Sequence, residues 1–147
     1  MDHSMLAAEL FSDGYNCAQA VAAAFSDVTG LTPAQSAKTV AAFGGGMGRM
    51  REVCGAVSGM FFVLSNLYGY ETPDQQAQMA LYATVQELAG KFREQAGSII
   101  CRELLENPPS DPKPTPRTEE FYKQRPCTRM VIIAASLLDE YIETHPL

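Results

Sequence analysis

Residues 51–69, with the sequence REVCGAVSGMFFVLSNLYG, are the stretch that most clearly decides how this chain folds. Its apolar side chains recur at intervals of three and four residues, at Val53, Ala56, Val57, Met60, Phe61, Leu64 and Tyr68. This spacing places them on one face of an α-helix, and Gly69 provides an end for that helix. We therefore expect a buried helix from about residue 51 to residue 68.

Two glycines, Gly55 and Gly59, lie four residues apart within this expected helix. A glycine inside a helix costs about 1 kcal/mol relative to alanine, so the pair needs a compensating use. We expect these two positions to allow the close approach of a neighbouring helix.

Similar patterns on both sides of this stretch predict more helices and no strands, over residues 17–29, 33–43, 73–96, 99–105 and 126–141. A threonine cap followed by proline, at Thr32-Pro33 and Thr72-Pro73, marks two of the helix starts. Five prolines between Asn107 and Thr118 exclude a helix or a central strand there. The expected fold is all-α, a bundle of five to six helices with a long proline-rich loop before the last helix.

The composition limits the partners and the location of the protein. The 147 residues, 46% of them hydrophobic, suffice for one domain, so we expect a single helical four-cysteine domain over residues 1–147. The net charge of −6 argues against nucleic acid and against anionic membrane surfaces. No apolar run approaches the ~20 residues that span a bilayer, and the first residues lack the pattern of a signal peptide. We therefore expect a cytoplasmic protein with no membrane insertion.

The four cysteines share one position in the predicted helices. Each lies in the first turn of a helix and on its apolar face, at Cys17, Cys54, Cys101 and Cys127. Unpaired backbone N–H groups and the positive end of the helix dipole favour a thiolate at such positions. Cysteines there have a lowered pKa and are more nucleophilic or more ready to bind metal.

The connections between the helices predict that these cysteines meet. If the first four helices run alternately up and down, Cys17, Cys54 and Cys101 all fall at one end of the bundle. The proline-rich loop is long enough to return Cys127 to the same end. We expect a cluster of four thiols, although inward-facing cysteines also occur as small apolar core residues, which is the simpler alternative.

These residues resemble a known family. The sequence CGAVSG at residues 54–59, the stretches 14–21, 43–48 and 101–105, and Cys127 are similar to the redox-active proteins named for the pattern C-GCAxxG-C-C. The resemblance covers nearly the whole chain, and all four characteristic cysteines are present. It implies redox activity and leaves the substrate undefined.

Thiol–disulfide exchange or electron transfer is the first chemistry that four such thiols favour. A thiolate of low pKa attacks a disulfide or is oxidised, and a second cysteine resolves the intermediate. Cys17 and Cys54 form the preferred pair, because both begin well-marked helices beside glycines. The expected partner is a redox protein or a small-molecule oxidant or reductant, and the protein would be a thiol–disulfide oxidoreductase.

A metal site is the second chemistry. Cys17, Cys54, Cys101 and Cys127 together could bind zinc or an iron–sulfur cluster as four thiolate ligands. The chain lacks the Cys-x-x-Cys spacing that is typical of zinc ribbons and ferredoxins, which argues against this alternative without excluding it.

A non-catalytic redox sensor or binding module is the third hypothesis for the function of this chain. Backbone N–H groups of Gly44–Gly48 could cradle an anion, although a tight turn that lets Cys54 approach its neighbours is the preferred use. Arg49 and Arg51 are expected to be surface charges that could nevertheless favour an anionic substrate or a thiolate. Arg102 and Arg129, each close behind a cysteine, are candidates to hold a thiolate.

The two histidines, His3 and His145, lie near the ends of the chain. We expect both to be exposed to solvent, so neither is a candidate base or metal ligand.

Overall fold

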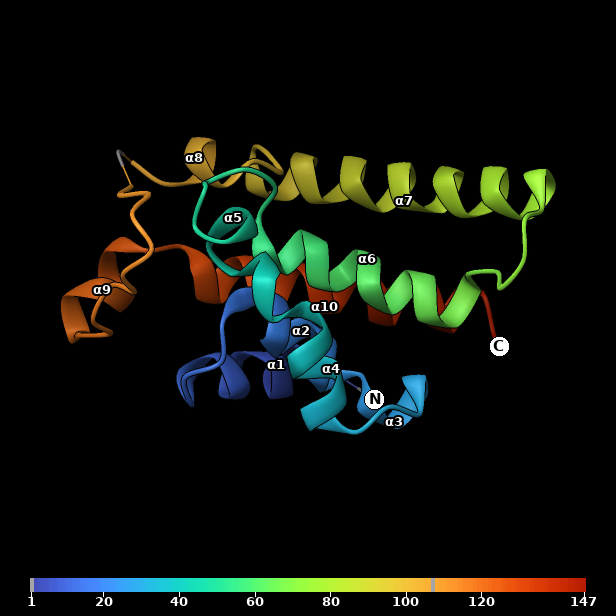
Figure 1. Ribbon diagram of the computed structural model, residues 1–147, viewed down its shortest axis with the longest axis horizontal. Helices are drawn as coiled ribbons and strands as arrows, with labels where there is room; N and C mark the ends of the chain where they lie inside the picture. The colour runs from blue at the N-terminus through green and yellow to red at the C-terminus, as the bar shows by residue number, and fades with distance from the viewer. Residues whose placement is uncertain (1, 107) are drawn as a thin grey trace.

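Helices form nearly all the regular structure of the protein (Figure 1). The computed structural model describes residues 2–106 and 108–147, apart from the side chains of residues 123 and 124. In chain order its elements are α1 (His3–Ser12), α2 (Cys17–Ala24), α3 (Ser26–Thr29), α4 (Pro33–Val40), the 3-10 helix η1 (Ala41–Phe43), α5 (Gly44–Met47), α6 (Gly55–Tyr68), α7 (Gln75–Ala96), α8 (Cys101–Leu104), α9 (Glu119–Gln124) and α10 (Cys127–Thr144). Within the described ranges the only extended pairing is an isolated bridge between Val53 and Ile100. The predicted all-α class is confirmed.

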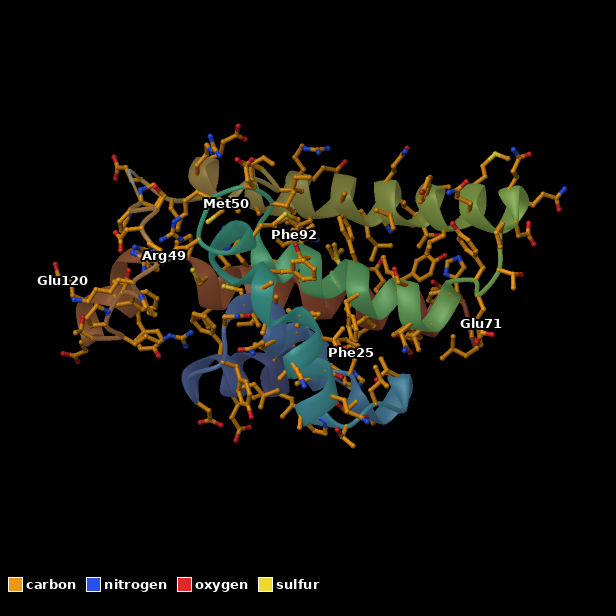
Figure 2. All side chains as sticks on the ribbon, in the orientation of Figure 1. Phe25, Arg49, Met50, Glu71, Phe92 and Glu120 are labelled. Atoms are coloured by element: carbon orange, nitrogen blue, oxygen red, sulfur yellow. The ribbon has the colours of Figure 1, made fainter. Side chains whose placement is uncertain are left out.

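The core lies between α1, α2, α6 and α10, and α7 packs along α6 and α10 with one side only. Phe25, Met60 and Leu138 are fully buried there. Burying a side chain of this size contributes about 1.5–3 kcal/mol each. Figure 2 shows Phe92 of α7 between that helix and α6, where it closes one side of the core.

The central helix α6 begins at Gly55 rather than near residue 51. Arg51 takes a left-handed backbone conformation with φ of 62°, which a continuous helix does not allow. Val53 then lies in the bridge to Ile100. The expected helical stripe is present from Ala56 onward, and the residues before it form a separate loop.

Capping side chains decide two other helix starts. Thr32 forms a capping box with Gln35 and Pro33 is the first residue of α4, as predicted. The start of α7 is at Gln75 rather than residue 73, because the carboxylate of Asp74 accepts hydrogen bonds from the backbone of residues 76 and 77.

Two helices were not predicted. α1 has only a short buried face, with Ala7 and Phe11, and it is held by packing against α10 and α2. α9 begins at a Thr118 cap that accepts a hydrogen bond from the backbone of Phe121. Short helices of this kind are marginal alone and form through tertiary contacts, which a local pattern does not reveal.

The segment between α8 and α9 contains no helix or strand over residues 108–118, and Asn107 lies outside the described residues. It is tied to the bundle where Arg51 donates a hydrogen bond from Nε to the carbonyl of Pro109, at 2.9 Å. No helix in the described ranges is both long enough and apolar enough to cross a membrane.

The expectation that His3 is exposed is wrong. Only 5% of its surface is accessible, and its ring stacks on Phe25. Its ring nitrogens hydrogen-bond to Asp27 and Asp139, at 2.9 and 2.5 Å. Its place near the end of the chain did not predict exposure, because α1 docks on the bundle. His145 is exposed, as expected.

Candidate functional site

The four cysteines lie at helix starts, as predicted. Cys17, Cys101 and Cys127 are the first residues of α2, α8 and α10, and Cys54 is the residue before α6. All four line a single cavity of about 30 Å³, which has room for about one water molecule. The structure therefore brings together residues that are up to 110 positions apart in the chain. In Figure 1 this is the end of the bundle that carries α5 and α8.

A short piece of backbone pairing places Cys54 beside Cys101. The backbone N–H of Cys54 donates to the carbonyl of Ile99 at 2.8 Å, and that of Cys101 donates to the carbonyl of Glu52 at 2.6 Å. These bonds flank the bridge between Val53 and Ile100. The two segments hold each other in an extended form, so that each is followed at once by a helix start.

Glycines allow the elements around the cavity to lie close together. A Cβ atom on Gly46 would lie 2.6 Å from Cβ of Cys101, and one on Gly55 would lie 3.1 Å from Cβ of Cys17. A Cβ on Gly59 would lie 2.7 Å from the carbonyl oxygen of Ala18. The prediction that Gly55 and Gly59 permit the close approach of a helix is confirmed, and that helix is α2. The glycine-rich segment approaches Cys101.

Cys17 and Cys127 form a hydrogen-bonded pair whose two pKa values are shifted in opposite directions. All four thiols are free. The hydrogen bond from Cys17, helped by the positive charges of Arg125, Arg51 and Arg117, lowers the pKa of Cys127 to about 7. The same hydrogen bond and burial raise the pKa of Cys17 well above its ordinary value. Cys127 is therefore the member of the pair that ionises near neutral pH, and Cys17 is held in the thiol form.

The other two thiols are held in the protonated form. Burial raises the pKa of Cys54 to about 12, although backbone N–H groups of α6 oppose the shift. Burial also raises the pKa of Cys101, against the hydrogen bond and the charge of Arg51. Both side chains are less than a tenth exposed, and neither is a ready nucleophile at neutral pH.

The expectation that Arg51 is a surface charge is wrong. Its side chain is buried, and its Nη1 donates a hydrogen bond to Sγ of Cys101 at 3.7 Å. Arg49 is also largely buried, with 13% of its side chain exposed. Both arginines have positive φ angles in the tight loop before Val53, and this backbone turns them inward.

Arg102 and Arg129 do not hold thiolates. Arg102 pairs with Glu52 at 2.5 Å and donates to the carbonyl of Arg51. Arg129 donates to the carbonyl of Gln95 at 2.8 Å. Each follows its cysteine on a helix and points away from the cavity because of the helical turn.

Arg117 and Arg125 are the two site residues that the sequence analysis missed. Both act on the pKa of Cys127, and both line a second pocket beside it. Arg125 stands two positions before Cys127, and this adjacency was a signal that could have been used. Arg117 reaches the site from the proline-rich segment, and no local pattern indicates that.

A metal site is not evident in this arrangement. Among the described residues, no three or more His, Cys, Asp and Glu side chains are placed so that they could hold a metal ion. The four cysteines share a cavity wall, while Cys17 hydrogen-bonds to Cys127 and Cys101 accepts from Arg51. Cys54 accepts from backbone N–H groups of its own helix.

The fold and the site together define an all-helical protein with four free thiols around one cavity. The family described as "Putative redox-active protein (C_GCAxxG_C_C)" matches residues 15–141. The chain belongs to this redox-active family, and the resemblance seen in the sequence is confirmed. A search of curated proteins and a search of solved structures gave no match.

Proposed function

We propose that the protein is a thiol–disulfide oxidoreductase in which Cys127 is the attacking thiolate and Cys17 is the resolving thiol. One observation carries this proposal: the two side chains are hydrogen-bonded, and the pKa of Cys127 is lowered to about 7. An attacking thiol is most effective when its pKa is near the ambient pH. The partly exposed positions of both residues give a substrate access to them.

The reaction proceeds in two exchanges. The Cys127 thiolate attacks one sulfur of a disulfide, a mixed disulfide forms, and the first substrate thiolate leaves. That thiolate takes the proton that Cys17 releases. The Cys17 thiolate then attacks Sγ of Cys127, and the second substrate thiolate leaves and takes a proton from water. Two electrons pass from the protein dithiol to the substrate, which ends as two thiols, while Cys17 and Cys127 end as a disulfide.

This pairing differs from the pair that the sequence favoured. Cys54 lines the same cavity as Cys17, but its raised pKa makes it a poor nucleophile or leaving group at neutral pH. The hydrogen bond from Cys17 goes to Cys127. We therefore assign resolution to Cys17 with Cys127 and expect Cys54 and Cys101 to remain thiols during the exchange.

The partner in this proposal is a redox protein or a small-molecule oxidant or reductant. The resting state requires a compartment that keeps the thiols reduced, and we infer the cytoplasm. Binding of zinc or an iron–sulfur cluster by the four cysteines is the competing proposal. Its support is that all four line one cavity.

The experiment is thiol labelling of the reduced protein over a range of pH, with the labelled sites identified by mass spectrometry. We expect Cys127 to be labelled first, with a rate that rises through a midpoint near pH 7. At pH 7 a thiol of pKa 7 is half ionised, whereas the pKa of each of the other three thiols is raised above 9, so that about 1% or less of each is ionised. Cys127→Ser should therefore remove the fastest labelling phase.

Two further variants separate the roles of the cysteines. Cys17→Ser should keep a reactive Cys127 but accumulate its mixed disulfide, because the resolving thiol is absent. Cys54→Ser is the matched control and should exchange as the native protein does. Equal reactivity of all four thiols would overturn the proposal. Protein purified without oxygen that carries stoichiometric zinc or iron and resists labelling would replace it with the metal site.

A further inference from the structure

Four arginines converge on a second pocket beside the cysteine cavity. Arg49, Arg51, Arg117 and Arg125 line it, together with Cys17 and Cys127. These are four of the eleven Lys and Arg residues of a chain whose net charge is −6. No aspartate or glutamate is among the described residues that line the pocket. The net charge argues against nucleic acid and anionic membrane surfaces, but this local concentration of positive charge favours a small anionic ligand.

The pocket has the size of a small anionic group. Its volume is about 120 Å³, which corresponds to about four water molecules. A carboxylate, phosphate or sulfonate fits that space. The pocket shares Cys17, Cys127 and Arg51 with the cysteine cavity, so a group bound here lies next to the reactive pair.

The arginines are fixed in place mainly by neutral partners. Arg51 donates to the carbonyl of Pro109 and to Sγ of Cys101. Arg117 donates to the carbonyls of Phe11 and Tyr15, and its guanidinium lies 4.2 Å from the centre of the Phe11 ring. Such contacts hold a guanidinium group without cancelling its charge.

Arg49 provides a second, independent indication of a ligand. Its Nε is fully buried and has no hydrogen-bond partner, and its Nη2 lies 4.0 Å from a carboxylate oxygen of Asp111, whose side chain is 62% exposed. A buried donor without a partner is costly, and a buried charge more so. Figure 2 shows Arg49 between the loop of α5 and the segment that leads to α9.

We propose that this pocket is an oxyanion-binding subsite that holds the acidic group of a small disulfide substrate while one of its sulfurs reacts with Cys127. The identity of the substrate rests on the proposed exchange reaction, whereas oxyanion binding rests on the pocket alone. Guanidinium groups bind carboxylates and phosphates through paired, charge-assisted hydrogen bonds. The electron and proton balance is that of the exchange above, with two acidic thiols as products.

The first arm of the test measures binding directly. Reduced protein is titrated with sodium sulfate at constant ionic strength, with sodium chloride as the reference salt, and thermal unfolding is followed. Sulfate should raise the Tm of the native protein more than chloride does. Sulfate also stabilises folded proteins in general by exclusion from their surface, so Arg49→Gln should reduce the difference to that general effect. Arg49→Lys should keep part of the excess, because lysine keeps the charge and loses the fork of donors. Arg93→Gln, on the exposed side of α7, should leave it unchanged.

The second arm compares exchange with 3,3′-dithiodipropionate, which carries two carboxylates, and with the neutral bis(2-hydroxyethyl) disulfide. The same two rates are measured with 2-mercaptoethanol as the attacking thiol in place of the protein. Dividing the protein's ratio of rates by that of 2-mercaptoethanol removes the difference in intrinsic reactivity between the two disulfides. The native protein should favour the acidic disulfide about tenfold. Arg49→Gln should lose most of this preference. Arg125→Gln repeats the test if Arg49→Gln does not fold.

Each outcome decides between the two proposals. Exchange with both disulfides at the free-thiol ratio, with the same sulfate effect in the native protein and Arg49→Gln, overturns the subsite and leaves the oxidoreductase intact. Sulfate binding that depends on Arg49, without exchange with either disulfide, keeps the oxyanion site and overturns the oxidoreductase. If the protein shows neither sulfate binding nor disulfide exchange, both proposals are overturned.

Discussion

The two ends of α1 lie against two different clusters of polar groups. At its beginning, His3 is buried between Asp27 and Asp139, and both ring nitrogens have carboxylate partners. Near its last turn, Phe11 lies under Arg117 and lines the pocket of four arginines beside Cys127. His3 and Phe11 are eight positions apart on α1, a rise of roughly 12 Å along the helix at 1.5 Å per residue.

The difference between these clusters lies in how their charges are compensated. The histidine cluster contains its own counter-charges, so it joins α1, α3 and α10 as a structural unit. The arginine cluster gathers four cations around Cys127 with one carboxylate nearby, that of the largely exposed Asp111, and its guanidinium groups are positioned mainly by carbonyls and an aromatic ring. Removing one partner of a buried ion pair is destabilising because the other charge is left uncompensated. Uncompensated charges in a site instead change the chemistry of a neighbouring group or bind a ligand.

The largest effect on stability is expected from Gly46→Ala at the cysteine end. The new Cβ would lie within 2.6 Å of Cβ of Cys101 and within 2.9 Å of backbone atoms of residues 51 and 52, at a φ of 74°. Overpacking and left-handed strain together should lower the free energy of unfolding by about 2–5 kcal/mol. Urea unfolding measures this change.

Gly90→Ala is the matched control for that variant. Gly90 is inside α7, and a Cβ there would meet no atom within 4 Å. Alanine should therefore stabilise the protein by about 0.5–1 kcal/mol through helix propensity. Equal effects of the two substitutions would show that the glycine-rich segment does not need its close approach to Cys101.

His3→Gln tests the other end of the comparison. Hydrogen bonds to Asp139 and Asp27 outweigh burial and raise the pKa of His3. The stabilising contribution of the protonated ring is therefore complete below about pH 6.5 and is lost as the pH rises through the folded-state pKa. The variant should lose about 1–3 kcal/mol at low pH through broken buried hydrogen bonds.

Urea unfolding of the native protein and His3→Gln at about pH 5.5 and about pH 8.5 measures this effect. The difference between the two proteins should be larger at the lower pH, and thiol labelling of Cys127 should be unchanged. A difference that does not depend on pH would mean that the histidine acts through packing alone.

The smallest effect is expected from Arg125→Gln. The charge of Arg125 contributes to the low pKa of Cys127, after the hydrogen bond from Cys17. Its removal should raise that pKa and slow labelling at pH 7 about two- to threefold, about 0.5 kcal/mol, as for a partly exposed charge pair. The pH dependence of the free energy of unfolding that His3 causes should remain in this variant. An unaltered labelling midpoint would show that the charge of Arg125 does not contribute to the low pKa of Cys127.

Local patterns predicted the helices that carry their own signals. The apolar stripe of α6 and the Thr32-Pro33 start of α4 were predicted because each depends on residues within a few positions. α1 and α9 were not predicted because their stability comes from tertiary contacts with the rest of the protein. The early start expected for α6 was wrong because the bridge to Ile100 competes with the helix over residues 51–53.

The placement of the cysteines was predictable, and their individual chemistry was not. Helix starts and the alternation of helix direction indicated a common end for Cys17, Cys54 and Cys101. The choice of Cys127 as the partner of Cys17 depends on a hydrogen bond across helices, and the burial of Arg51 depends on a left-handed loop. Neither is encoded within a short window of sequence.

By itself, the sequence determined the all-α class, the four helix starts at cysteines and the glycines that let helices approach, since these follow from backbone preferences over a few residues. Only the tertiary structure decided which thiol has a lowered pKa and where the positive charge gathers. Electrostatic effects depend on distances between residues that are far apart in the chain, and packing alone sets those distances.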